Sequence, residues 1–236
     1  LNWEPKWSSS RAFGKVLGAM ISENYSSGMD VVDIGLLAAQ LGYSVKAFGN
    51  WTVHVSTHQF VNVANQPIKS FEKDAKTDPY SYPFDRYRGN TAYPNDALLP
   101  PDSRKYYLQN QFALVEAGFE WKHKFGVFEP SAYFDFVENG YTAPLNSGQE
   151  LGVALRWTDL QISWMKSRKE ADAVVGAFTD SDVNGGGSDN EGTRVGITYY
   201  ILKNAQLALN VYSADRGIDS VKRKYEATQL DFGASF

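Results

Sequence analysis

The sequence predicts an all-β fold: an antiparallel up-and-down transmembrane β-barrel that occupies residues 1–236 as a single domain. Apolar and polar residues alternate with the period of two that gives a strand one apolar and one polar face. The final stretch, Thr228 to Phe236, shows this most clearly. The links between such stretches are by turns long and short, as expected for a barrel with short turns at one end and long loops at the other. A soluble sandwich with Greek-key connections has no reason to keep this rhythm.

The alternation resolves about ten strands. They span residues 11–23, 33–48, 51–62, 109–123, 127–138, 149–157, 160–174, 193–202, 205–213 and 224–236. Short links fall at 49–50, 124–126, 158–159 and 203–204, and the others are longer. The strict alternation of long and short links places Phe236 at the periplasmic rim. If the chain closes on itself, Thr228 to Phe236 pairs with Arg11 to Glu23, and in a larger barrel its partner lies elsewhere.

Each strand has an apolar face, such as Val53 and Val55, that is expected to meet lipid. The opposite face carries polar groups, which need water or one another and are expected to line the lumen. The predicted pore-lining residues are His54, His58, Glu116, Glu120, Lys122, Glu129, Asp135, Glu150, Arg156, Arg194, Gln206, Asn210 and Asp231. Acidic residues predominate among the charged ones, so a weak preference for cations is expected.

Composition excludes several other classes. The apolar, uncharged run worth testing, Ile34 to Val45, has 12 residues, fewer than the roughly 20 apolar residues of a spanning helix. A net charge of -4 gives no basic surface for nucleic acid, and the absence of cysteine removes disulfides and thiolate chemistry. The aromatic content of 14% fits the aromatic girdles of a barrel. It also fits a secreted carbohydrate-binding sandwich, which is a less favoured alternative.

The segment Val63 to Leu108 holds most of the prolines and cannot be a central strand. Loops of this length are usually functional or disordered. In a barrel it either folds inward and narrows the lumen or lies over the mouth as an external loop, and a plain surface loop fits equally well.

The loop between residues 175 and 192 matches a calcium-binding pattern, in which oxygen ligands at alternating positions surround a cation and a glycine makes the sharp turn. The candidate ligands are Asp180, Asp182, Asn184, Gly186, Ser188 and Glu191. Calcium loops usually lie between helices, whereas a strand follows here, so a plain glycine-rich external loop is the preferred interpretation.

No catalytic constellation is predicted. His54 and His58 share one face of a strand but are too far apart to chelate one ion without a third ligand. Ser56 points to the same side, yet nothing completes a triad. The carboxylates are dispersed, so no acid and base pair can be nominated. The chain is expected to be neither an enzyme nor dependent on a cofactor.

The C-terminal part resembles a known family. Residues from Lys169 onward contain EADAVVGAFTDSD, a glycine-rich loop, the turn Lys203-Asn204 and the terminal TQLDFGASF. In this order they resemble the C-terminal part of the bacterial outer-membrane family described as "putative porins". The resemblance implies passive diffusion of small hydrophilic solutes through a monomeric or homotrimeric barrel. The loop DVNGGGSDNE and the short chain depart from the family's usual pattern.

Strand number bears on whether a pore exists. About eight strands leave an interior filled by side chains, and about 16 to 18 leave an aqueous channel. The chain is therefore expected to be either a compact barrel with a constricted lumen or the C-terminal part of a larger one. The predicted function is that of an outer-membrane porin in contact with lipid and small solutes. The alternative is a non-conducting small barrel with an adhesive or structural role.

Overall fold

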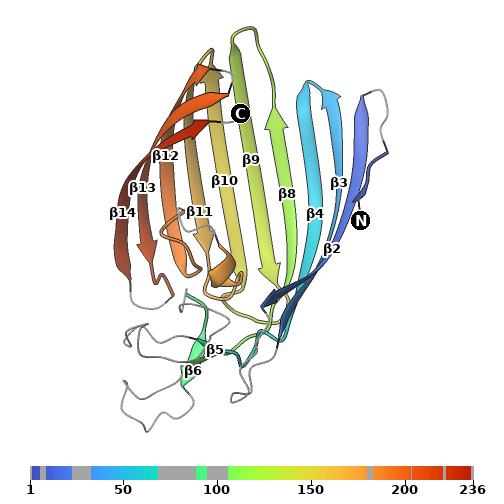
Figure 1. Cartoon of the computed structure of the whole chain (residues 1–236), viewed down its shortest axis with the longest axis vertical. Coiled ribbons are helices and arrows are strands. Elements are labelled where there is room, and N and C mark those ends of the chain that lie inside the picture. The colour runs from blue at the N-terminus through green and yellow to red at the C-terminus, as the bar shows by residue number, and fades with distance from the viewer. Residues whose placement is uncertain are drawn as a thin grey trace.

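The fold is built almost entirely of strands. A computed structural model describes residues 2–5, 9–22, 33–68, 89–94, 106–179, 183–202, 204–219 and 222–234. Within these ranges, no helix is long and apolar enough to span a membrane. The elements, shown in Figure 1, are β1 (Asn2–Trp3), β2 (Ser10–Ser22), β3 (Ile34–Ala47), β4 (Gly49–Val61), β5 (Pro67–Ile68), β6 (Ala92–Pro94), β7 (Tyr106–Leu108), β8 (Ala113–Lys122), β9 (Phe128–Asn139), β10 (Ser147–Trp157), β11 (Leu160–Lys169), η2 (Gly176–Phe178), β12 (Asn190–Leu202), β13 (Ala205–Arg216) and β14 (Arg223–Ala234).

Every strand predicted from the alternation is present, so the all-β, antiparallel prediction is confirmed. The large sheet contains 11 strands in the order β1-β2-β3-β4-β8-β9-β10-β11-β12-β13-β14, and a small sheet, β5-β7-β6, lies within the connection from β4 to β8. The large sheet is curved but open (Figure 1). Within the described ranges β14 pairs with β13 and not with β2, whose free edge carries only β1. Phe236 lies outside those ranges.

The connections alternate as the sequence predicts. The links at Phe48, 123–127 and 158–159, together with Asn204 between β12 and β13, lie at one end of the sheet, the upper end in Figure 1, which we call the turn end. The strand ends joined by the longer connections, such as those from β4 to β8 and from β11 to β12, lie at the opposite end, which we call the loop end. Short hairpins on one side and longer connections on the other are the arrangement of a β-meander in which every strand reverses direction.

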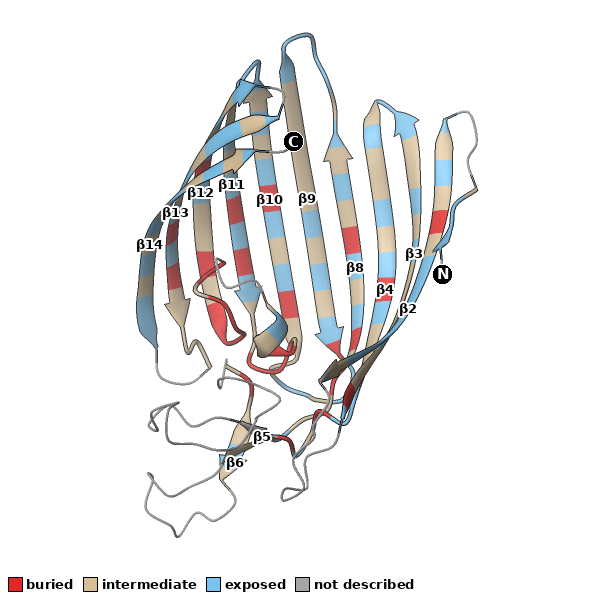
Figure 2. Cartoon of the chain, in the orientation of Figure 1, coloured by how far each residue is buried: buried red, intermediate tan, exposed pale blue. Residues whose placement is uncertain are grey.

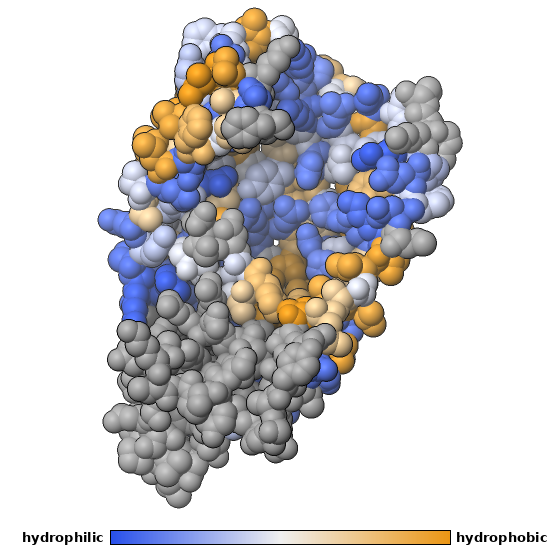
Figure 3. Space-filling view, in the orientation of Figure 1, coloured by the Kyte–Doolittle hydropathy of each residue, from blue (hydrophilic) through white to orange (hydrophobic). Residues whose placement is uncertain are grey.

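The two faces of the sheet differ in polarity. Exposed and less exposed residues alternate along the strands (Figure 2). The convex face presents apolar side chains that are exposed, and Val195, Ile197 and Leu209 are 48%, 45% and 41% exposed. The concave face, toward the viewer in Figure 3, is largely hydrophilic in its middle and upper parts. Since soluble proteins rarely expose contiguous apolar surface on this scale, the convex face calls for an apolar environment.

Buried apolar side chains gather at the loop end. The main cluster comprises Ile34, Phe60, Val63, Leu108, Phe112, Leu114 and Val175. Its members come from strand ends and from the connections, and the rings of Phe60 and Phe112 meet edge to face with centroids 6.5 Å apart. The cluster anchors the long connections against the sheet, because burying these side chains is favourable only while the connections stay packed.

Glycines on the concave face leave room for side chains from the neighbouring strand. Gly152 on β10 is paired with Tyr133 on β9, and a Cβ at residue 152 would overlap the Tyr133 ring. The Tyr133 hydroxyl donates a hydrogen bond of 2.7 Å to Glu150 Oε1. The ring therefore lies flat along the sheet instead of projecting into the space above it.

Gly152→Ala is expected to lower the free energy of unfolding by about 1–3 kcal/mol, because the added methyl forces the Tyr133 ring out of its position. The control is Gly35→Ala, where the nearest atoms to a new Cβ are 3.8 Å away. Urea unfolding of the two variants measures the difference. Equal costs at the two positions would contradict the packing argument.

Candidate functional site

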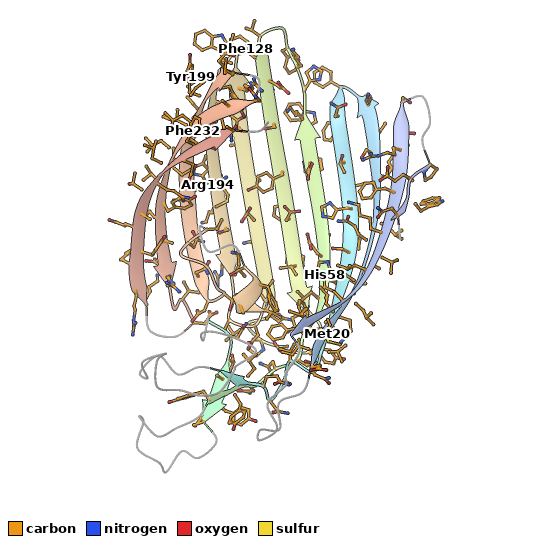
Figure 4. The ribbon with its side chains drawn as sticks, in the orientation of Figure 1. Met20, His58, Phe128, Arg194, Tyr199 and Phe232 are labelled. Atoms are coloured by element: carbon orange, nitrogen blue, oxygen red, sulfur yellow. The ribbon has the colours of Figure 1, made fainter. Side chains whose placement is uncertain are left out.

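The concave face is the candidate functional site, and strand register brings its polar residues together. All of the predicted pore-lining residues lie on this face. The cross-strand pairs show this, because from β4 to β14 they relate these residues to positions on the same side of the sheet. Figure 4 places Arg194 at middle height and His58 near the loop end. That this face lines a water-filled pore stays a prediction.

An acidic group occupies the middle of the concave face. Glu116, Asp135 and Glu150 come from β8, β9 and β10, where Asp135 is paired with Glu150 and with Gly118. Glu116 Oε2 accepts a hydrogen bond of 3.1 Å from Ser56 Oγ. His54 Nε2 lies 3.5 Å from Glu116 Oε1 and 3.9 Å from Asp135 Oδ1. This group gives the middle of the face a negative character.

Basic residues lie on the same face. Lys122 Nζ is 2.7 Å from Glu129 Oε1 near the turn end. The guanidinium of Arg156 stacks on the Tyr200 ring with its central carbon 4.0 Å from the ring centroid. Arg194 borders a cavity of about 480 Å³ on this face. The charges of both signs that the sequence predicts are thus present, and they are arranged along the strands.

The connection from β11 to β12 folds over the concave face, whereas the sequence predicts an external loop at 175–192. The Asn184 side chain donates to Ser167 Oγ at 2.8 Å and fills the space beside Gly192 where a side chain would otherwise stand. Ser167 and Gly192 are paired on β11 and β12. Figure 2 shows the buried residues of this connection in front of the sheet at the loop end.

This connection reaches from one side of the concave face to the other. Near one end of its path, a Cβ at Gly185 would lie 3.0 Å from the Tyr225 ring of β14. At the other, Phe178 stacks on Phe60 of β4 with ring centroids 5.9 Å apart. A cavity of about 350 Å³ lies between the connection and the sheet, with Phe178, His58 and Glu116 in its lining. The connection therefore narrows the space above the sheet.

The described part of segment 63–108 packs against this connection. Buried Asn90 donates to the carbonyl oxygens of Ala171 and Val174 at 2.8 and 2.7 Å. Its own oxygen accepts a bond of 2.8 Å from the Gly176 amide. The described residues of segment 63–108 thus hold the β11–β12 connection in place. The predicted lumen or mouth position of the segment concerns residues that lie outside the described ranges.

Asp172 also joins the β4–β8 connection to the β11–β12 connection. Its carboxylate accepts hydrogen bonds from the Thr91 amide at 2.9 Å, the Thr91 hydroxyl at 2.6 Å and the Asn110 side-chain amide at 2.8 Å. Each of these bonds crosses from the β4–β8 connection to the β11–β12 connection. Buried carboxylates are retained when such donors satisfy them, so Asp172 ties the two connections together. In the sequence, close packing at this position is indicated by the small residues Ala171 and Ala173 on either side of Asp172.

The β13–β14 connection contacts the β11–β12 connection through Asp219. Its Oδ2 accepts a bond of 3.2 Å from the Ala171 amide, and its own amide donates to Asp189 Oδ1 at 2.7 Å. Partial burial, with the nearby Asp189 and Glu170 carboxylates, raises the pKa of Asp219 above its ordinary value of 3.8. The β13–β14 connection is thereby attached to the connection that crosses the concave face.

The calcium candidates that the structure describes do not all lie on one side of the sheet. Asp180 and Asp182 lie outside the described residues. Ser188 Oγ donates to the Ala171 carbonyl at 2.7 Å, and the Gly186 amide donates to Val183. Glu191 is on the convex side of β12, where its carboxylate lies 2.9 Å from Lys166 Nζ, whereas Asn184 is on the concave side. Calcium binding by this loop stays a prediction without support from the residues in view.

The fold and the site together define the class of protein to which the chain belongs. The chain is an antiparallel β-meander whose apolar face points outward and whose polar face is concave and partly covered by one connection. A family model described as "Putative porin" matches residues 108–236. The chain belongs to this family. A search of curated proteins gave no match.

Proposed function

We propose that this protein is an outer-membrane porin through which small hydrophilic solutes and ions diffuse passively. The observation that carries the proposal is the reversed polarity of the sheet: a convex face of exposed apolar side chains and a concave face of charged and amide groups. Such a sheet suits lipid on one side and water on the other. Membership of the porin family supports the same assignment.

The borders of the apolar face support a membrane location. At the turn end, Trp51 and Trp121 lie with ring centroids 6.0 Å apart, and both indole N–H groups donate to the Phe48 carbonyl. Indole rings favour the membrane–water interface. Toward the loop end, the convex face carries the Lys166–Glu191 ion pair. Between these borders, the strand from Thr193 to Ile201 runs for about 26 Å, close to the roughly 25 Å of a barrel's apolar band.

A membrane-spanning form requires the sheet edges to be paired. Unpaired backbone N–H and C=O groups cost several kcal/mol each in hydrocarbon, so spanning sheets close into barrels. The proposal therefore includes closure through β14 and β2, either by their own pairing or through further strands. No catalytic step and no cofactor are part of it.

The mechanism would be sieving. The β11–β12 connection limits the width at the loop end, and solutes pass the acidic group of Glu116, Asp135 and Glu150 in the middle. Fixed negative charges along a narrow pore raise the local concentration of cations. The pore is therefore expected to prefer cations weakly.

Purified, refolded protein in a planar bilayer is expected to give ohmic conductance with a reversal potential shifted toward the cation side in a salt gradient. The double variant Glu116→Gln/Glu150→Gln is expected to reduce this shift, because it removes two negative charges with little change in side-chain volume. The matched control is Glu138→Gln, an exposed glutamate on β9 whose parity puts it on the convex face.

Absence of conductance from folded protein would contradict the porin assignment and favour a non-conducting barrel with an adhesive or structural role. Conductance with an unchanged selectivity in the double variant would instead contradict the role given to the acidic group.

A further inference from the structure

The imidazole of His54 faces two carboxylates from two other strands. His54 on β4, Glu116 on β8 and Asp135 on β9 each offer one ligand atom, and these atoms all lie within 4.8 Å of one another. The His54 side chain is 12% exposed, and those of Glu116 and Asp135 are 29% and 37% exposed. The three groups are thus partly shielded while water still reaches them.

The separations exceed those of direct hydrogen bonds. An imidazole N–H bonded to a carboxylate lies about 2.7–3.2 Å from its acceptor, whereas His54 Nε2 is 3.5 Å from one carboxylate oxygen and 3.9 Å from the other. Zinc bonds to nitrogen and oxygen are about 2.0–2.1 Å long, and tetrahedral geometry then sets ligand atoms about 3.3–3.5 Å apart. The two separations from His54 Nε2, 3.5 and 3.9 Å, are close to this value, and each of the three ligand atoms lies within 4.8 Å of the others.

The sheet positions the three ligands. His54 is paired with Gly118, and Gly118 with Asp135, so the first and last ligands lie on one row across three strands. A Cβ at residue 118 would overlap both the His54 ring and the Asp135 carboxylate. The convergence of the ligands therefore depends on glycine at this position.

A neighbouring group orients the third ligand. Ser56 is paired with Glu116 and donates to its Oε2, which leaves Oε1 turned toward His54. Hydrogen bonds of this kind hold the carboxylate ligands of metal sites in place. Glu116 and Asp135 also border the cavity of about 350 Å³ under the β11–β12 connection, which gives an ion a route from solvent.

We propose that His54, Glu116 and Asp135 bind a divalent transition-metal ion such as zinc on the concave face of the sheet. One imidazole nitrogen with two carboxylate oxygens suits zinc better than calcium or magnesium, which take oxygen ligands almost exclusively. Three protein ligands leave a fourth position for water or a solute. The ligands come from residues far apart in sequence, and the pairing of β4, β8 and β9 assembles them.

The test is calorimetric titration of zinc into the full, folded chain in detergent after treatment with a chelator. One equivalent is expected to bind, and His54→Ala and Asp135→Asn are each expected to weaken binding at least about tenfold. His58→Ala is the matched control, since this histidine lies on the same face of the same strand about 13 Å away, and it is expected to bind zinc like the parent. Far-UV circular dichroism confirms that each variant is folded.

Cobalt gives a second readout, because the visible absorption of four-coordinate Co²⁺ reports the ligand set directly. The bands are expected in the parent and in His58→Ala and are expected to disappear in His54→Ala. No saturable binding, binding that survives in His54→Ala, or binding lost equally in His58→Ala would overturn the site. Neither readout uses conductance, so failure of the metal site and failure of the porin assignment are distinguishable.

Discussion

Replacing residues 173–187 with a short glycine–serine turn is expected to raise single-channel conductance about two- to fivefold. The connection that carries these residues crosses the concave face from the Tyr225 ring on β14 to the Phe60 ring on β4. Because the ionic current through a pore depends on its narrowest section, removing the element that narrows the loop end widens the path. The graft is practical because Ser188 Oγ and the Ala171 carbonyl are already hydrogen-bonded at 2.7 Å, so the two ends lie together.

A graded variant sharpens this test. Phe178→Ala removes the ring that stacks on Phe60 and is expected to raise conductance by less than the full replacement. The matched control is Phe134→Ala, which deletes a ring of the same size from the convex face of β9, where it is 39% exposed. An unchanged conductance after loop replacement would show that the connection does not limit the current.

Arginine in the middle of the apolar face is expected to cost about 2–4 kcal/mol of folding free energy in a bilayer, and about 0–1 kcal/mol near the edge of the apolar band. Ile197 is the central position, because it is paired with Ile162 on one side and Leu209 on the other. Thr193 is on the same strand and face but is paired with Lys166 and Ser213. Ile197→Arg is therefore expected to be far more destabilising than Thr193→Arg.

Equilibrium unfolding from phospholipid vesicles, followed by tryptophan fluorescence, measures both variants against the parent. The depth dependence is the diagnostic feature, since arginine at an exposed position of a soluble protein would change the free energy of unfolding little, whatever its place along the strand. Equal stabilities of Ile197→Arg and Thr193→Arg would contradict a lipid-facing surface.

Strand positions were predictable because they depend on local pattern. Alternation at Val195, Ile197 and Tyr199 is legible in one stretch of sequence, and it assigns β12 and its two faces without knowledge of any neighbour. The order of short and long links was predictable for the same reason, since Lys203-Asn204 and its counterparts interrupt the pattern where they occur. The facing of the polar residues followed from strand parity.

The contents of the concave face were not predictable in this way. The loop at 175–192 was predicted to be external, because nothing in its glycine-rich sequence reveals that Asn184 fits beside Gly192 or that Asn90 accepts a hydrogen bond from the Gly176 amide. Strand parity places His54 on the same face as Ser56 and His58 of its own strand, whereas the carboxylates that it faces, Glu116 and Asp135, come from two other strands.

The sequence by itself determined an antiparallel β-meander with one apolar and one polar face, because a period of two is a property of each strand alone. Only the tertiary structure decided which polar groups meet on the concave face and which connection narrows it. Those features depend on register between strands and on packing between connections, which join residues that are distant in the chain. The open edges at β14 and β2 are likewise a feature of the tertiary structure, since the pairing of an edge depends on a second strand and not on the pattern within one strand.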